Sequence, residues 1–282
     1  MAFNHCINIG IMNIRAQTGL NFVKQRQIED FLVAHKLDIL HLQESHIDDD
    51  TFLDCKVIAS GYEIIANNSA NKFGTASLVK SDLDVRNIGF DQEGRVIVFD
   101  VGEHFTCGNF YLPCGSDRVA KGKREKYCAE IIPQLLVNRR GVGMCGGDFN
   151  CITSKADATR NAEVKMSPSL QSLVSTFAWT DSFRLLYPSA KSYSRYYTLE
   201  KHGEGATRID RLYHWGNISV QEASYQSLAF SDHMSLITSY ILPAQMSRII
   251  CPRSSPNFKI KPEVVLDEIF KQELERQMGD WL

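Results

Sequence analysis

Short apolar runs that end in polar residues recur through most of this 282-residue chain. Two such runs, at 7–15 and 37–45, enclose a segment at 22–36 whose apolar side chains have helical spacing. Strands are also predicted for further runs, at 61–67, 74–81, 95–101, 105–113 and 141–152, then around 208–216 and 233–242. A helix is predicted for 124–139, interrupted near Pro133. This alternation of strands and helices predicts an α/β fold in which helices flank stacked sheets.

The composition is that of an ordinary globular domain, with 44% hydrophobic and 23% charged residues. The formal net charge of −2 gives no basic field over the whole protein, so any nucleic-acid contact must come from local basic clusters. No apolar run reaches the length of a membrane span, and the first residues do not resemble a secretory signal. The eight cysteines contain no C-x-x-C pair, and we expect reduced thiols in an intracellular protein that does not act at a membrane.

The C-terminal part of the sequence differs from the rest. Four prolines interrupt residues 243–262, and residues 262–282 have the pattern of an amphipathic helix. We therefore expect one domain over residues 1–242, followed by a linker and helix at 243–282.

Polar side chains stand where the predicted strands end, and this placement is the main functional signal in the sequence. In sheets of this kind, strand ends that converge on one edge carry the binding and catalytic groups. The residues in question are Asn13, Gln43, Glu44, Tyr111, Asp148, Asn150, Asp210, Asp232 and His233. A single polar residue at a strand end is common, but a full series of them predicts a site.

The residue types suggest phosphodiester chemistry. Glu44 and Asp232 could supply the carboxylate oxygens that Mg²⁺ prefers, and Mn²⁺ could take its place. Asp148 could orient or deprotonate an attacking water. The amides of Asn13 and Asn150 could donate hydrogen bonds to phosphate oxygens. His233 beside Asp210 could remain an imidazolium next to the phosphate, or the two could be a buried pair that only ties two strands together.

The motifs MNIR (12–15), LQES (42–45), NFYLP (109–113), GGDFN (146–150), TRIDRLY (207–213) and SDH (231–233) resemble, in order, those of the endonuclease/exonuclease/phosphatase superfamily. The resemblance spans residues 7 to about 242 and implies a DNase I-like fold, a two-sheet α/β sandwich flanked by helices, with Mg²⁺-dependent hydrolysis of phosphate esters. It implies Glu44 as a metal ligand with Asp232 near the metal, Tyr111 and Asn150 as phosphate contacts, and Asp148 as the residue that activates the nucleophile. It further implies Asp210 and His233 as the pair at the scissile phosphate, and Asn13 as the first-strand asparagine.

Within the superfamily the sequence is most similar to the endonuclease domains of non-LTR (LINE-type) retrotransposons, through N-I-R, GGDFNCI and TRIDRLY. Thr207 replaces the usual serine before R-I-D. This resemblance implies an enzyme that nicks double-stranded DNA in the nucleus to prime retrotransposon integration, and a reverse transcriptase domain in the same polypeptide.

Five residues are candidates for DNA contacts. Local basic residues surround the predicted hairpin before R-I-D, and its turn has two glycines. The basic members are Arg15, Arg195, Lys201 and Arg208. Ser194 joins them because the resemblance implies it, as the match to the Ser/Thr of the superfamily's Tyr-Thr motif. A second basic cluster at 118–126 is either another DNA-binding surface or ordinary solvated loop charge.

Other functions are less consistent with the sequence. The main alternative is an abasic-site or exonuclease III-like repair nuclease, although the tryptophan that usually precedes the first-strand asparagine in abasic-site nucleases is missing before Asn13. A phosphatase of the same fold would need a headgroup site, which the sequence does not indicate. A non-catalytic binding module would lack some of the motif residues. No G-x-S-x-G elbow or P-loop occurs, which argues against a serine hydrolase or an NTPase.

Overall fold

The computed structural model describes residues 6–16, 21–46, 61–67, 74–103, 105–139, 141–160, 165–199 and 203–243. The chain divides into two compact units, Met1–Cys251 and Pro252–Leu282, and all described residues belong to the first. The linker and helix predicted for 243–282 lie, apart from Pro243, outside the described residues. In the described residues, no helix is both long and apolar enough to span a bilayer.

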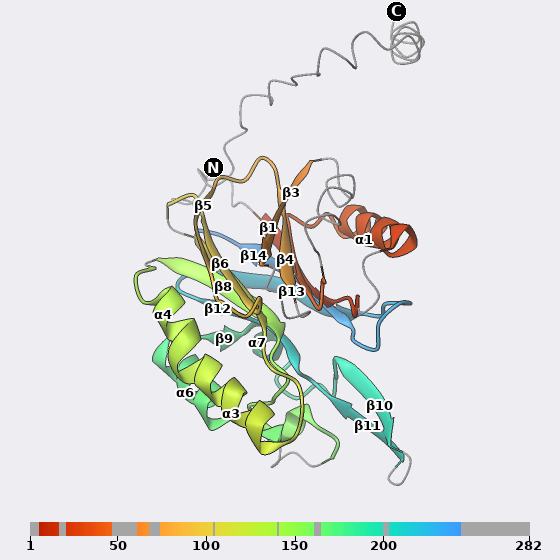
Figure 1. Cartoon of the computed structure of the whole chain (residues 1–282). Coiled ribbons are helices and arrows are strands. Elements are labelled where there is room, and N and C mark those ends of the chain that lie inside the picture. The colour runs from red at the N-terminus through yellow and green to blue at the C-terminus, as the bar shows by residue number, and fades with distance from the viewer. Residues whose placement is uncertain are drawn as a thin grey trace, which may run out of the picture. The chain divides into compact units, whose positions relative to one another are not determined.

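Two mixed six-stranded sheets form the centre of the domain (Figure 1). The first has the order β13-β14-β1-β2-β4-β3. Its strands are β1 (Cys6–Asn13), β2 (Ile39–Gln43), β3 (Tyr62–Asn67), β4 (Thr75–Lys80), β13 (Ser219–Gln226) and β14 (Ser235–Ile241). The pair β1–β2 is parallel and the other pairs are antiparallel.

The second sheet has the order β5-β6-β7-β8-β12-β9. Its strands are β5 (Val85–Phe90), β6 (Val96–Val101), β7 (Phe105–Tyr111), β8 (Val142–Asp148), β9 (Thr180–Asp181) and β12 (Asp210–Trp215). Here β7 and β8 are parallel. A separate two-stranded hairpin, β10 (Arg195–Leu199) and β11 (Gly203–Thr207), extends from the body of the domain (Figure 1).

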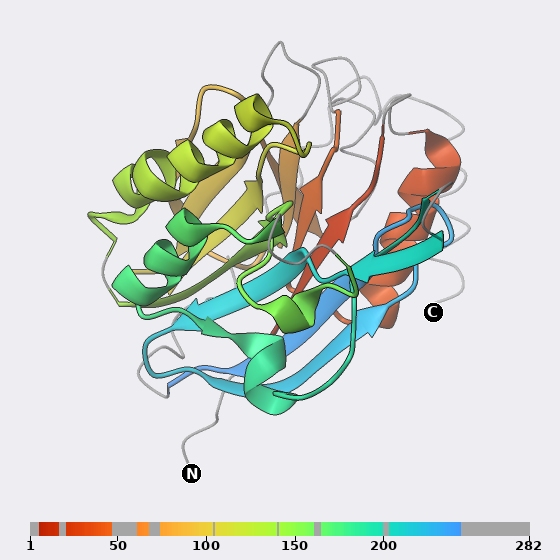
Figure 2. The same ribbon diagram turned by 90° about the horizontal axis from the view of Figure 1, so that it is seen from below.

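Apolar side chains fill three layers between these elements. Isoleucines of β1 pack against β6 and β12 side chains such as Phe99 and Leu212, which joins the two sheets face to face. Helix α1 (Phe22–Ala34) covers the outer face of the first sheet with Ile28 and Leu32. The outer face of the second sheet is covered by α3 (Arg118–Lys126), the π-helical turn η1 (Tyr127–Ile131), α4 (Ile132–Leu136) and α6 (Pro168–Thr176). The helices therefore lie on both sides of the stacked sheets (Figure 2), and the predicted two-sheet sandwich is confirmed.

Two local predictions need correction. The helix predicted for 124–139 begins earlier, at Arg118, because Asp117 caps it by accepting hydrogen bonds from two backbone N–H groups. Its irregularity is the π-turn before Pro133. The basic cluster at 118–126 therefore lies on a helix instead of a loop, and Arg124 in it is buried, with Nη1 donating to the carbonyls of Pro113 and Gly115.

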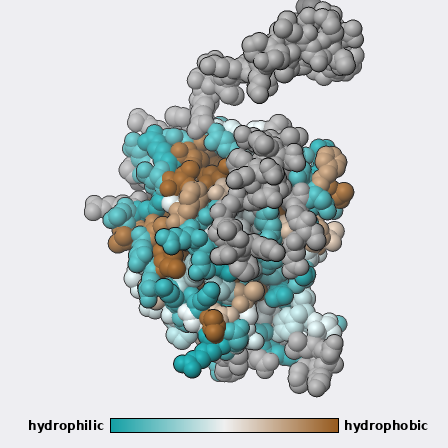
Figure 3. Space-filling view, in the orientation of Figure 1, coloured by the Kyte–Doolittle hydropathy of each residue, from teal (hydrophilic) through white to brown (hydrophobic). Residues whose placement is uncertain are grey.

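The surface is mostly hydrophilic on the face shown in Figure 3, with an apolar cluster over the β5 edge of the second sheet. Ile88 and Phe90 of β5 are both partly exposed there. Sequence patterning missed this strand because its side chains do not alternate between buried and exposed. Among the described residues, the remaining short helices are η2 (Lys155–Asp157) and α7 (Ser182–Leu186).

Candidate active site at the strand ends

The predicted strand-end residues lie at one edge of the two stacked sheets. The parallel pairs bring them there, because Asn13 is in register with Gln43, and Tyr111 is in register with Asp148. Asp210 at the start of β12 also pairs with Asp148. Two buried amides connect the sheets just behind this edge, with Gln43 Nε2 donating to Asn109 Oδ1 at 2.7 Å.

Asn13 links two carboxylates that come from different sheets. Its Nδ2 donates to Glu44 Oε1 and to Asp148 Oδ2, both at 3.1 Å, while its Oδ1 accepts the backbone N–H of Arg15. Asn13, which the sequence predicts as a hydrogen-bond donor to phosphate, thus orients two carboxylates in this structure. Its contact with phosphate stays a prediction. Tyr111 donates its hydroxyl to the same Glu44 oxygen at 3.1 Å. Burial, then Glu44 and Asp148, raise the pKa of Tyr111, so the phenol remains a donor.

Asp148 is buried at the centre of the cluster, with 1% exposure. Burial, followed by the nearby Asp210 carboxylate, raises its pKa to about 7, against the opposing effect of His233. Asn150 contributes its backbone N–H to Asp148 Oδ1 at 2.8 Å and its side-chain amide to Oδ2 at 3.3 Å. The same amide also donates to the carbonyl of Leu112.

The residue before Asp148 must be glycine. Gly147 has φ +139°, and a Cβ there would lie 2.0 Å from the carbonyl oxygen of Phe110. Three other residues at this edge, Arg15, Glu44 and Asn150, also have positive φ values, between 44° and 52°. Non-glycine residues in this region cost free energy, and they concentrate where a structure positions functional groups.

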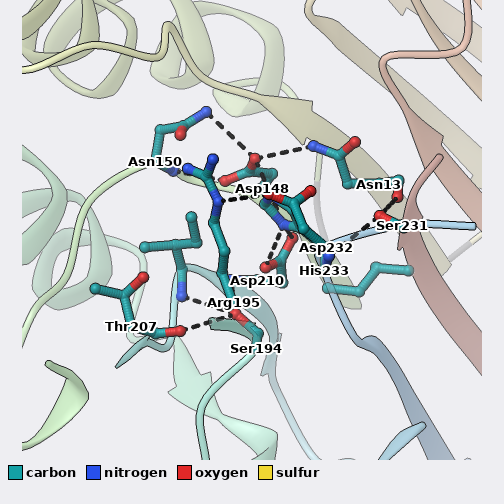
Figure 4. Close-up of polar contacts among 12 residues, drawn as sticks. Asn13, Asp148, Asn150, Ser194, Arg195, Thr207, Asp210, Ser231, Asp232 and His233 are labelled. Carbon is teal, nitrogen blue, oxygen red and sulfur yellow. Dashed lines mark hydrogen bonds and ion pairs between the residues drawn. The ribbon is translucent and has the colours of Figure 1, made fainter. Parts of the chain in front are cut away.

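His233 and Asp210 form the predicted buried pair. His233 Nδ1 lies 2.9 Å and 3.1 Å from the two carboxylate oxygens of Asp210, and 4.0 Å from Asp148 Oδ2 (Figure 4). Burial lowers the pKa of His233, but the charge and hydrogen bonds of Asp210 outweigh burial and raise this pKa to about 9. The imidazole is therefore protonated near neutral pH.

Hydroxyl groups hold this pair in place. Ser231 donates to the Asn13 carbonyl at 2.7 Å and accepts the backbone N–H of His233. Ser194 has no exposed surface, and its Oγ accepts the backbone N–H groups of Ile209 and Asp210, each at 3.0 Å. Sequence reasoning did not single out Ser231, although its position in the SDH triplet was a usable signal.

The five predicted DNA contacts divide into three groups. Arg15 and Arg195 are partly exposed, and both pair with Asp232. Ser194 and Arg208 are buried in this conformation, and their role as DNA contacts stays a prediction. Arg208 makes a bidentate ion pair with Asp157 and a further one with Asp181, which directs its guanidinium into the protein. Lys201 lies outside the described residues.

Two places at this edge offer carboxylate oxygens to a divalent cation, Glu44 and the more buried group of Asp148, Asp210 and His233. Asp148, Asp210 and His233 offer ligand atoms within 4.8 Å of one another, but His233 Nδ1 lies 2.9 Å from Asp210 Oδ2, and Asp210 favours the protonated imidazole. A protonated imidazole cannot be a ligand. Glu44 is oriented by neutral donors, Asn13 and Tyr111, which leave its negative charge for a hard cation. His41, which precedes Glu44 in the sequence, is wholly buried and hydrogen-bonded to Ser77, so it is not a surface ligand.

No family model matches this sequence, and neither does any curated protein. Solved structures do resemble it. The AP endonuclease from Archaeoglobus fulgidus superimposes with a TM-score of 0.69 at 16% identity, over 82% of this chain and 98% of that one. The chain has the AP endonuclease fold. The 3'-5' exonuclease NExo from Neisseria meningitidis superimposes with a TM-score of 0.69 at 19% identity, over 84% of this chain and 100% of that one. The AP endonuclease LMAP from Leishmania major superimposes with a TM-score of 0.67 at 17% identity, over 84% of this chain and 88% of that one.

Proposed function

We propose that this chain is a divalent-metal-dependent nuclease that hydrolyses phosphodiester bonds in DNA. One observation carries the proposal. At a single sheet edge, Asn13 connects Glu44, a carboxylate suited to a cation, with Asp148, a buried carboxylate of raised pKa. Strongly perturbed groups that converge with metal-binding oxygens are typical of hydrolytic sites.

Asp148 is the group that takes a proton from the attacking water. Its raised pKa of about 7 places it close to neutral pH, where a carboxylate is an effective general base. The backbone N–H of Asn150 and the amide of Asn13 fix the orientation of the carboxylate. The proton therefore passes to an oxygen whose position is set before substrate binds.

His233 stabilises the negative charge that develops on the phosphate. Asp210 keeps it protonated through Nδ1, which leaves Nε2–H to donate to a phosphate oxygen. A divalent cation bound by Glu44, with Asp232 nearby, would neutralise phosphate charge and polarise the ester.

Plasmid nicking tests this proposal. Glu44→Ala and Asp148→Ala should each reduce Mg²⁺-dependent conversion of supercoiled plasmid by about 10²-fold or more, because each removes a group that acts in the transition state. Glu29→Ala, which removes a carboxylate on α1 that pairs with Arg26, is the matched control and should nick normally. Folded Glu44 and Asp148 variants with wild-type rates would overturn the assignment.

The biological role that we propose is nicking of chromosomal DNA for a LINE-type retrotransposon. The sequence motifs support this, and the role implies a nuclear site of action and a reverse transcriptase in the same polypeptide. Primer extension tests it. The nicked strand should carry a 3′-hydroxyl that a reverse transcriptase can extend on an RNA template. A blocked 3′ end would exclude this role while leaving the nuclease proposal intact.

A repair nuclease is the second candidate, and the structural neighbours favour it. Two of these are AP endonucleases, and a further structure shows the Neisseria 3' phosphatase NExo with a product DNA hairpin. Cleavage of one duplex with and without an abasic site separates the candidates. Cutting confined to the abasic duplex would favour repair, whereas equal cutting of both would favour the retrotransposon enzyme.

We also propose that the β10–β11 hairpin selects the position of the cut. Its turn lies between Leu199 and Gly203, outside the described residues, and none of the proposed ligands or bases belongs to it. Replacing 199–205 by a two-residue turn should redistribute nicks on a sequenced duplex while Mg²⁺-dependent cleavage persists. An unchanged nick map would mean that the hairpin is only a connector.

A further inference from the structure

Asp232, the second predicted metal ligand, is held by two arginines from distant parts of the chain. Arg15 Nη1 lies 3.1 Å from Asp232 Oδ1, and Arg195 Nε donates to Oδ2 at 3.2 Å. Arg15 follows the end of β1, and Arg195 begins β10. Each oxygen of the carboxylate therefore lies beside a guanidinium group.

Arg195 also lies among the other catalytic carboxylates (Figure 4). Its backbone forms a bridge with His233, the residue after Asp232. Burial lowers the pKa of Arg195, but Asp232, Asp148 and Asp210 together raise it above its ordinary value. The guanidinium thus balances negative charge that a cation would otherwise balance.

These ion pairs are of a kind that can exchange. The side chain of Asp232 is 28% exposed, and those of Arg15 and Arg195 are 44% and 39% exposed. Exposed pairs contribute little to stability, because water competes for both partners. The Arg208–Asp157 pair in the same protein is the opposite case, with side-chain exposures of 1% and 0%.

A phosphate group competes directly with such a carboxylate. Guanidinium binds phosphate and carboxylate with the same two-pronged geometry, and DNA presents phosphates at high density. A phosphodiester that reaches this edge of the sheet would meet two partly exposed guanidinium groups already placed beside the catalytic cluster.

We propose that Arg15 and Arg195 occupy the Asp232 carboxylate until a DNA phosphate takes its place, and that this exchange frees Asp232 to bind the divalent cation. The inference rests on the proposed nuclease function, and it adds a coupling between the two ligands. DNA increases the affinity for the cation and, by linkage, the cation increases the affinity for DNA to the same extent.

Mn²⁺ binding to the full chain without DNA tests the exchange, with free Mn²⁺ measured by electron paramagnetic resonance. The double variant Arg15→Gln/Arg195→Gln should bind Mn²⁺ about 2- to 20-fold more tightly than wild type, which is the range expected for two exposed pairs. Arg86→Gln is the matched control, since Arg86 pairs with Asp84 near the opposite end of the second sheet. It should leave the affinity unchanged.

Removing positive charge could also favour Mn²⁺ simply by reducing repulsion, and a double-mutant cycle with Asp232→Asn separates the two causes. If the arginines act by occupying Asp232, their removal should have no effect once Asp232 is replaced. An equal gain in the Asp232→Asn background would overturn the proposal. So would no loss of Mn²⁺ affinity when Asp232→Asn is added to the double arginine variant, in which the carboxylate is free of both guanidinium groups.

The DNA arm uses a His233→Gln background, so that a fluorescent 20-base-pair duplex (the probe) stays intact during the measurement. Anisotropy reports duplex binding, and Mn²⁺ affinity is measured in the same samples. The duplex should tighten Mn²⁺ binding in the parent and have a weaker effect when both arginines are replaced. Duplex binding with no change in Mn²⁺ affinity refutes the coupling. If no duplex binds, the nuclease proposal fails, and the DNA-free arm still decides whether the arginines occupy Asp232.

Discussion

The Asp210→Asn substitution tests the proposed state of His233 most directly. His233 is 4% exposed, and burial alone would keep its pKa below the ordinary value of 6.5. Asp210 instead raises this pKa to about 9. The difference corresponds to roughly 3 kcal/mol of preferential interaction with the imidazolium. Without the Asp210 charge, the pKa of His233 should fall below 7, because only the more distant Asp148 still favours the proton.

Nuclear magnetic resonance measures this change. The ring signals of His233 are followed from pH 5 to pH 10 in metal-free protein and are assigned by their loss in His233→Gln. Asp210→Asn should also abolish most nicking at neutral pH, since a neutral imidazole stabilises phosphate charge poorly. A folded Asp210→Asn protein whose His233 pKa stays above 8 would refute the claim that Asp210 keeps the imidazole charged.

The same pair predicts how stability depends on pH. A histidine whose pKa is raised by folding stabilises the native state fully below its unfolded pKa, near 6.5, and this contribution disappears as the pH rises through about 9. Urea denaturation should therefore show that wild type loses roughly 3 kcal/mol relative to Asp210→Asn between pH 6 and pH 10. If the free energies of unfolding of wild type and Asp210→Asn vary with pH in the same way, Asp210 does not raise the pKa of His233 in the folded protein.

Three further predictions concern the framework of the site. Burial lowers the pKa of His41 to about 3. The free energy of unfolding should therefore be fully retained above pH 6.5 and decrease as the pH falls, by roughly 2 kcal/mol at pH 5. Urea denaturation of His41→Gln should not show this decrease. Asp157→Asn removes one of the two carboxylates that pair with the buried Arg208 and should cost about 3–5 kcal/mol in urea denaturation. Gly147→Ala should sharply lower the melting temperature, because its Cβ meets a backbone carbonyl, whereas Gly122→Ala, with open space around it, should not.

Sequence patterning predicted the sheets well because most core strands are continuous apolar runs. Strands β1, β2 and β4 are almost entirely buried, and strands buried on both faces have mostly apolar sequences. Strand β5 was missed for the converse reason, since it is a half-exposed edge strand that contains Asn87 and Gly89. The start of α3 was missed because the helix is held by a cap and has only one buried residue, Arg124.

The candidate site was predictable in part. Strand ends are visible in sequence, so the residues that end them could be named, and the structure brings Asn13, Glu44 and Asp148 together. The partners of a charged side chain are not visible in the same way. Arg208 resembles a DNA contact in the sequence, but its two carboxylate partners are at positions 157 and 181, and only the folded chain brings them to it. The same limit applies to the pairing of Arg15 with Asp232, which lie at opposite ends of the domain's sequence.

The root and the turn of the β10–β11 hairpin have different relations to the chemistry. At the root, Ser194 accepts the backbone N–H of Asp210 on its hydroxyl and the backbone N–H of Met234 on its carbonyl, so it connects the hairpin to both members of the His233–Asp210 pair. Farther along, the described contacts between the hairpin and the body include those of Thr159 with Ala206. A change at the root therefore moves the His233–Asp210 pair, whereas a change at the turn leaves these contacts in place. On the proposed nuclease function, we therefore expect turn variants to change the position of the cut and to retain its mechanism.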